Sequence, residues 1–184
     1  MFRIETPRLR VRSLSRDDFA SLSRIIGDPE VMKYSLHGIY DENATRQFID
    51  WCRNCQATYG FSPWAVEDKV SDELIGFSGI YPEVVNDCEE VGLGYRFARH
   101  RWNRGFATEA NLAVLEYAFT QRQVPTVIAL IEPDNAASVR VAEKIGFRDF
   151  VETRFVDRNV RAYRVSRNQW LETRQESERN RSVS

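Results

Sequence analysis

The sequence predicts one α/β domain built on a mixed, mostly antiparallel sheet. Three strand patterns, Trp64–Asp68, Leu74–Tyr81 and Val91–Ala98, follow one another across polar turns, and such short connections favour antiparallel pairing. The run Thr126–Ile131 is apolar without alternation, which is typical of a central strand with both faces covered. A helical pattern from Phe106 to about Gln121 separates these two parts of the predicted sheet.

The chain before these strands predicts one further strand and two helices. Leu9–Leu14 alternates apolar and polar side chains, as a half-buried strand does. Ser15, with acids directly after it, is a typical helix N-cap, and that helix runs to about Ile26. A second helix fits Glu42–Tyr59 and ends at Gly60.

The chain after the central strand predicts a short helix and a hairpin. The helix covers Asn135–Lys144 and closes at Gly146, where glycine readily takes the left-handed conformation. Phe150–Val156 and Val160–Ser166 have the pattern of two strands joined by a tight turn. The last strand is expected to leave an exposed edge at which two subunits could pair, so a homodimer is possible.

Length and composition favour a single cytoplasmic domain. The 184 residues, 42% of them hydrophobic, suffice for one well-cored domain, which we assign to residues 1–170. Residues 171–184 are polar and are expected to form a flexible tail. The formal net charge of -1 argues against general binding to nucleic acid or to anionic membranes. We find neither a signal peptide nor an apolar run long enough to cross a bilayer.

Cys52 and Cys55 have the spacing of a redox or metal motif. They share a helical stripe with Phe48 and Tyr59, at positions i, i+4, i+7 and i+11. There is no second cysteine pair, and neither histidine has ligand spacing to this one. We therefore interpret them as buried thiols that act as small hydrophobes, and we expect no metal site.

The most informative segment is the arginine-rich turn before the helix that begins at Phe106. Four arginines fall between Arg96 and Arg104 with no carboxylate among them, and Gly105 follows. Glycine allows close approach to the backbone, and the unpaired N–H groups that open a helix attract anions. A solvated surface is the alternative. The combination favours a site for a phosphorylated small molecule.

Two segments resemble one known family. Trp102–Ala110 (WNRGFATEA) resembles the acetyl-coenzyme A pyrophosphate loop of the GNAT family of N-acetyltransferases. Asn135–Phe147 resembles the same family's later Asn-x-x-Ser…Glu-Lys-x-Gly-Phe segment. The first motif and the opening Glu5–Leu9 point to the branch that includes ribosomal-protein N-terminal acetyltransferases. The resemblance runs in order from about Ile4 to Trp170.

This resemblance implies direct transfer of acetyl from acetyl-coenzyme A to an amine, without a covalent enzyme intermediate. The acceptor would be a protein N-terminus or a small-molecule amine. The implied fold has about seven strands and about four helices, and its sheet splays between the strand ending at Phe97-Ala98 and Thr126–Ile131. A catalytically inactive protein that binds acetyl-coenzyme A as a sensor or interaction module is the alternative, and a longer acyl chain is a further one.

The resemblance also implies roles for particular residues. Backbone N–H groups from about Asn103 to Thr108 would hold the pyrophosphate, and Asn135 would bond the pantetheine arm. Ser138 would lie near the sulfur as a proton donor, unless it is only a first-turn helix serine. The full set implied for the cofactor is Phe97, Ala98, Asn103, Arg104, Gly105, Phe106, Ala107, Thr108, Asn135, Ser138 and Lys144.

Two departures from the family pattern concern proton transfer. Gly92 stands where the branch often has a glutamate, and Ala142 stands where the wider family often has a tyrosine acid. Glu90 shares the strand face of Gly92, and we hypothesise that it acts as the base through water. An α-amino group with a pKa near 8 is already about 10% neutral at pH 7, so the missing glutamate leans toward a low-pKa amine.

The acceptor pocket has aromatic candidates, because the loop between the first two predicted helices carries Tyr34, His37 and Tyr40. Trp51 and Trp64 are further candidates, and for Trp64 we favour core packing. No spacing in this set identifies the acceptor.

Overall fold

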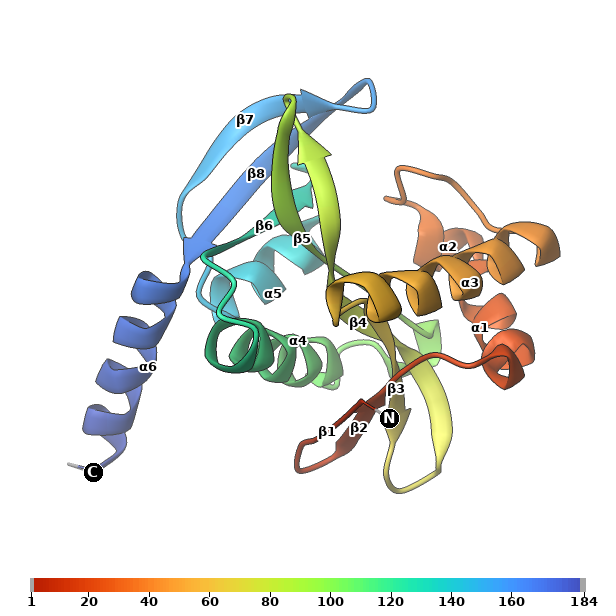
Figure 1. The fold of residues 1–184 in the computed structure, drawn as a ribbon, viewed down its shortest axis with the longest axis horizontal. Helices are drawn as coiled ribbons and strands as arrows, with labels where there is room; N and C mark the ends of the chain where they lie inside the picture. The colour runs from red at the N-terminus through yellow and green to blue at the C-terminus, as the bar shows by residue number, and fades with distance from the viewer. Residues whose placement is uncertain (1, 183–184) are drawn as a thin grey trace.

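The computed structural model describes residues 2–182, which form one mixed sheet covered by helices (Figure 1). The strand order is β1-β2-β3-β4-β5-β6-β8-β7. The strands are β1 (Arg3–Glu5), β2 (Leu9–Arg12), β3 (Pro63–Asp68), β4 (Glu73–Val85), β5 (Cys88–Phe97), β6 (Thr126–Ile131), β7 (Phe150–Phe155) and β8 (Arg158–Ser166). The helices are α1 (Phe19–Ile26), α2 (Pro29–Met32), α3 (Glu42–Tyr59), α4 (Phe106–Glu116), α5 (Ala136–Lys144) and α6 (Arg167–Ser182).

The sheet splays between β5 and β6. These two strands run parallel and are registered at a single pair, Gly92 with Ile128, over their described lengths. The other neighbouring strands are antiparallel. Strands β4 and β5 stay paired along their length, from Gly76 opposite Phe97 to Val85 opposite Cys88. The predicted mixed, splayed sheet is therefore confirmed, with an eighth strand, β1, that the sequence did not reveal.

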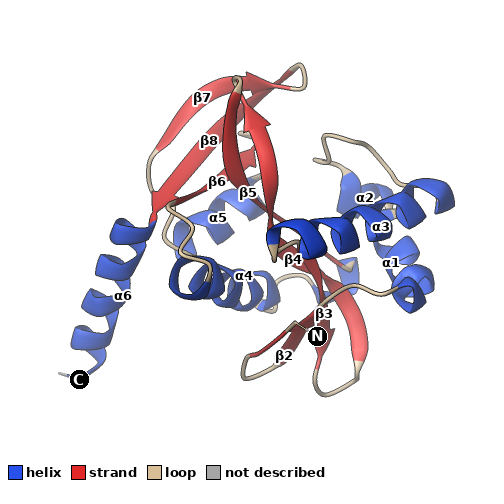
Figure 2. Ribbon diagram, in the orientation of Figure 1, coloured by secondary structure: helices blue, strands red, loops and turns tan. Residues whose placement is uncertain are grey.

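The two faces of the sheet carry different helices (Figure 2). Helices α4 and α5 cover one face, where Trp64 and Ile80 join the larger core cluster. Helices α1 to α3 cover the other face, where Ala65 and Phe77 join a second cluster. Strand β6 has buried side chains on both faces, which explains its unbroken apolar run.

The predicted elements are found at closely matching positions, with differences at their polar ends. Helix α3 has the predicted bounds. The predicted helix from Phe106 to about Gln121 is α4 followed by a π-helical turn, Tyr117–Gln121. The β4–β5 hairpin continues to a turn at Asn86 and Asp87, both with positive φ. This outer part was missed because its charged residues do not alternate with apolar ones.

The C-terminal segment is helical in the structure. Helix α6 continues as far as Ser182, across most of the residues expected to form a flexible tail. Its Trp170 is buried and lies 5.4 Å from the Phe119 ring, between ring centroids. Residues 183 and 184 lie outside the described range. Within that range, no helix is both long and apolar enough to cross a membrane.

The cysteine interpretation is confirmed for the pair on α3. Cys52 and Cys55 are both buried free thiols, and Cys52 packs in the cluster under α1 and α3. Burial raises the pKa of both thiols, which disfavours the reactive thiolate. Strand β7 forms one edge of the sheet and exposes Val151. The homodimer through such an edge stays a prediction.

We predict that Gly79→Ala destabilises the fold by about 2–3 kcal/mol, because overpacking forces backbone to move. A Cβ at this position would lie 2.1 Å from the Ser62 carbonyl oxygen. Gly38→Ala is the matched control, since its positive φ adds conformational strain but its Cβ would meet open space. We expect the control to cost about 1 kcal/mol. Equal losses in urea unfolding would contradict the steric explanation.

Candidate active site

Two hollows meet at the end of β5. The first, here called the α4–α5 groove, has a volume of about 480 Å³ and runs from the N-terminal end of α4 along the length of α5. The second, here called the aromatic cavity, has a volume of about 640 Å³ and lies on the α3 side of the sheet. Tyr34, Tyr95 and Arg96 line both hollows. The splay of the sheet thus connects a groove on one face with a cavity on the other.

The start of α4 presents unpaired N–H groups to the groove. Gly105 is the N-cap residue, with φ of 78°, a conformation that favours glycine. The N–H of Glu109 donates to the Gly105 carbonyl at 3.0 Å. The N–H groups of Phe106, Ala107 and Thr108, which line the groove, precede that first helical bond. With the helix dipole they form an anion site.

A carboxylate anchors this helix start to the β1–β2 turn. Glu109 accepts hydrogen bonds from the Thr6 hydroxyl at 2.6 Å and from the Arg8 N–H and Nε at 2.9 and 2.6 Å. The Arg8 guanidinium also donates to the Arg104 carbonyl at 2.9 Å and lies 4.6 Å from the centroid of the Phe106 ring. The loop before α4 is therefore held from outside the groove.

The four arginines of the turn do not form one cluster. Arg101 lines the groove but pairs with Asp68 at 2.9 Å and with Glu73. Arg99 is exposed beside a different hollow, and Arg104 is absent from the groove's lining. Arg99 and Arg104 therefore lie outside the groove lining, because successive residues of a tight turn point in different directions, and a role for Arg104 at the cofactor stays a prediction. Additional positive charge in the groove comes from Lys33, Arg140 and Lys144.

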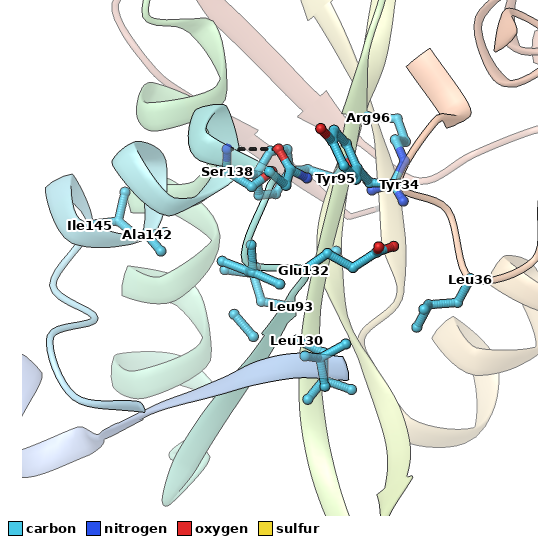
Figure 3. Close-up of a pocket in the computed structure, with 15 residues that line it drawn as sticks. Tyr34, Leu36, Leu93, Tyr95, Arg96, Leu130, Glu132, Ser138, Ala142 and Ile145 are labelled. Carbon is cyan, nitrogen blue, oxygen red and sulfur yellow. Dashed lines mark hydrogen bonds between the residues drawn. The ribbon is translucent and has the colours of Figure 1, made fainter. Parts of the chain in front are cut away.

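Ser138 and Tyr95 face each other where the groove narrows (Figure 3). The Asn135 side chain caps α5 by accepting the Ser138 backbone N–H at 3.1 Å, so Ser138 is not its own cap. The buried Tyr95 hydroxyl makes no hydrogen bond with a described residue, although it is near enough to Ser138 for that hydroxyl to lower its pKa. Burial outweighs this effect and raises the Tyr95 pKa. Ala142 lines the same narrow space.

The aromatic cavity is lined by rings from three elements. Phe48 and Trp51 on α3 lie 5.8 Å apart between centroids, and Trp51 meets Tyr81 of β4 edge-to-face at 5.7 Å. Of the aromatic candidates from the sequence, Tyr34, His37, Tyr40 and Trp51 line this cavity. Trp64 is instead buried in the core, as we favoured, and donates to the Gln56 side chain at 2.7 Å.

Glu83, rather than Glu90, lines the aromatic cavity. Glu90 makes a bidentate ion pair with Arg164 of β8, with nitrogen–oxygen distances of 2.6 and 2.9 Å. Glu83 lies directly opposite Glu90 in the β4–β5 register and has no ion pair among the described residues. A Cβ at position 92 would lie 3.4 Å from the Glu83 Cβ. The Glu83 side chain therefore begins next to position 92, where the family branch often has a glutamate.

Comparison with known proteins identifies the family. A family model described as an acetyltransferase (GNAT) domain matches residues 8–148. The chain belongs to the GNAT acetyltransferase family. YkkB of Bacillus subtilis, an uncharacterized protein, is 41% identical over 145 residues, which cover 78% of this chain and 84% of YkkB.

Solved GNAT structures share this fold. A GNAT acetyltransferase from Bacillus anthracis superposes with a TM-score of 0.78 at 24% identity and covers 91% of this chain and 99% of its own. Spermidine N-acetyltransferase from Vibrio cholerae, solved with CoA and spermine, gives a TM-score of 0.74 at 19% identity over 90% of this chain and 99% of its own. At these identities the likeness shows the fold alone, and membership of the ribosomal-protein branch stays a prediction.

The structure brings most residues that the GNAT resemblance implied to the α4–α5 groove. Those that line it are Phe97, Asn103, Gly105, Phe106, Ala107, Thr108, Asn135, Ser138 and Lys144. Ala98 does not, because it is buried in the cluster on the opposite face from Phe97. Sequence reasoning missed Tyr95, Lys33 and Arg140 as groove residues. Arg140 could have been found, since it lies four residues before Lys144 on one helix face.

We predict that Glu109→Gln lowers the free energy of unfolding by about 1 kcal/mol at pH 7, since its partner Arg8 is half exposed. Burial raises the pKa of Glu109, but the hydrogen bonds from Thr6 and Arg8 lower it by more, so the pKa lies below the ordinary 4.5. This stabilisation is present above about pH 4.5 and is lost as the pH falls through the folded-state pKa.

Unfolding by urea at pH 7 and at pH 3 measures the effect, and the gap between the two proteins should shrink at pH 3. Glu116→Gln is the matched control, because Glu116 is exposed on the same helix and pairs with Arg174 at 3.4 Å. A gap that is constant with pH would show that the Glu109 charge contributes nothing.

Proposed function

We propose that this GNAT protein is an N-acetyltransferase that transfers acetyl from acetyl-coenzyme A directly to an amine. The observation that carries the proposal is the adjacency of the α4–α5 groove, which holds the unpaired N–H groups of α4, and the aromatic cavity, which share Tyr34, Tyr95 and Arg96 in their linings. The groove suits a phosphorylated ligand, and the cavity suits an organic acceptor.

The residues of the groove fit acetyl-coenzyme A. The N–H groups of Phe106, Ala107 and Thr108 would bind the pyrophosphate, while Lys33, Arg140 and Lys144 supply positive charge for the phosphates. Where β5 and β6 diverge, β5 lacks a strand partner on that side, so its N–H groups would be available to the pantetheine amides. The Tyr95 and Phe97 carbonyls, in contrast, already accept from Arg96 Nη1 and Trp102 Nε1. When bound, the cofactor supplies a thioester-activated acetyl group.

Transfer forms a C–N bond from the amine lone pair and breaks the C–S bond, and the amine loses a proton while the thiolate gains one. Tyr95 and Ser138 are the hydroxyl donors at the narrow part of the groove. Because burial raises its pKa, Tyr95 keeps its proton at neutral pH and suits the role of an acid. Tyr95 would thus replace the family tyrosine that is missing at Ala142.

Glu83 is the base that the geometry favours over Glu90. Its carboxylate lines the acceptor side, whereas the Glu90 carboxylate is held by Arg164. Burial and the charge of Glu83 raise the pKa of Tyr81 to about 12, so Tyr81 is not an alternative base at neutral pH. Glu83 would accept the amine proton directly or through water.

We predict that Gly105→Asp weakens acetyl-coenzyme A binding about 100-fold, because like charges would meet at the phosphate site. Calorimetric titration measures this, with ATP and NAD as controls for selectivity. Gly105→Ala is the matched variant, since it adds the strain of a positive φ without the charge. We expect only a small loss for Gly105→Ala. Unchanged affinity in the aspartate variant would move the phosphate site elsewhere.

Turnover separates the enzyme from an inactive acetyl-coenzyme A sensor of the same fold. A sensor would bind the cofactor but release no free thiol with any amine. The acceptor-side carboxylate and the buried tyrosine favour the enzyme, because neither is needed to bind the cofactor.

We predict that Glu83→Gln lowers kcat at pH 7 by about 10²-fold, as expected for loss of a general base. The loss should shrink at higher pH, where more of the amine is already neutral. Glu90→Gln, on the same hairpin, should leave kcat and its pH profile unchanged. Thiol-release assays across the pH range measure both variants. A larger effect in Glu90→Gln would restore Glu90 as the base.

A further inference from the structure

Arg96 lies at the junction of the two hollows and has no counter-ion among the described residues. Its Nη1 donates to the Tyr95 carbonyl at 2.7 Å, and no carboxylate of the described residues pairs with it. Three other arginines near the site are paired, Arg101 with Asp68, Arg158 with Glu132 and Arg164 with Glu90, whereas Arg140 in the groove has no ion pair among the described residues either. Arg96 is only partly exposed, and a partly desolvated guanidinium without a counter-ion is costly, so this position needs an explanation.

The surroundings of Arg96 point to a ligand rather than to packing. Arg96 lies on the β5 face that carries the aromatic cavity, opposite Phe77, and it also lines the groove and the narrow space between the two hollows. The titratable groups that interact with the Arg96 charge are the hydroxyls of Tyr40, Tyr81 and Tyr95. A protonated tyrosine carries no negative charge, so these groups do not act as a counter-ion. Burial lowers the Arg96 pKa, but guanidinium keeps its charge at neutral pH. An anion that enters from the cavity would complete the site.

We propose that the acceptor is a small amine bearing an anionic group, such as a carboxylate, a few bonds from the nitrogen, and that Arg96 binds this group. This inference rests on the proposed N-acetyltransferase function. Arg96 stands where the cavity meets the groove, so an anion there lies close to the amine that must reach the thioester. The rings of Phe48, Trp51 and Phe77 would contact an apolar remainder of the acceptor. Amphiphilic amino acids have this combination.

The same charge disfavours other acceptor classes. A polyamine would place a second cation beside Arg96, with Glu83 as the acid on the acceptor side. A protein N-terminus has a neutral peptide group where an amino acid has its carboxylate. The proposal therefore separates this chain from both of these acceptor classes.

The test compares L-phenylalanine, L-methionine and L-tryptophan with their carboxamides, by thiol release with acetyl-coenzyme A. We expect kcat/KM at least tenfold higher for the acids, although the amides have the less basic and more readily neutral amines. Arg96→Gln should bring the ratio of acid to amide near one, and Arg96→Lys should retain part of the preference. Arg53→Gln, an exposed charge on α3, should leave the ratio unchanged.

Cofactor affinity distinguishes the acceptor role from a cofactor role. The Kd for acetyl-coenzyme A should be the same in wild type and in Arg96→Gln. A raised Kd with an unchanged acid-to-amide ratio would assign Arg96 to the cofactor and overturn the proposal. Turnover of spermidine or of the amides at least as fast as the acids would also overturn it, while leaving the N-acetyltransferase function intact.

A binding measurement covers the case in which none of these amines is acetylated. Phenylacetate and phenylacetamide are amine-free probes, and Trp51 in the cavity reports their binding by fluorescence. We expect phenylacetate to bind wild type at least tenfold more tightly than phenylacetamide, and Arg96→Gln to lose this difference. Equal binding of both probes to wild type would overturn the proposal. Thermal melting confirms that Arg96→Gln folds, which we expect because the change removes an unpaired charge.

Discussion

The divergence of β5 from β6 is the constraint on which the rest of the site depends. A continuous sheet would pair every backbone group of β5, and it would separate the α4–α5 side from the α3 side. Here the two strands are registered only at Gly92 and Ile128. Strand alternation points Tyr95 and Arg96 to opposite faces of the sheet at the free end of β5, and both residues line both hollows there. Two ligands can meet there because the sheet does not close.

The order of the elements was predictable because short stretches of sequence carry the patterns that indicate it. Apolar periodicity located α3 and β6, and caps and glycines marked helix ends such as Gly60 and Gly105. Strand β1 was not predictable because its three residues are too few for a pattern to stand out, and the outer β4–β5 hairpin was not predictable because its charged side chains do not alternate with apolar ones. These segments form strands because they pair with a neighbouring strand through backbone hydrogen bonds. Such pairing depends on the tertiary fold and cannot be recognised in the local sequence.

The residues of the candidate site also fall into those that local sequence could predict and those that depend on the fold. The groove residues from Gly105 to Thr108 and from Asn135 to Ser138 are contiguous in sequence, so motifs located them. The roles proposed for Glu83 and Tyr95 depend on their positions across strands, which a motif does not encode. The arginine turn shows the opposite error, since closeness in sequence suggested one cluster where the fold separates the side chains. Arg101 was already neutralised by acids more than 25 residues away.

The ring of Tyr81 has an evolutionary consequence. It covers Gly92 and Gly94 so closely that a Cβ at these positions would lie 3.0 and 2.8 Å from ring carbons. A glutamate at position 92 therefore requires the Tyr81 ring to shift or to be replaced by a smaller side chain. Positions 81 and 92 should therefore change together among homologues, with the large ring and the acid mutually exclusive.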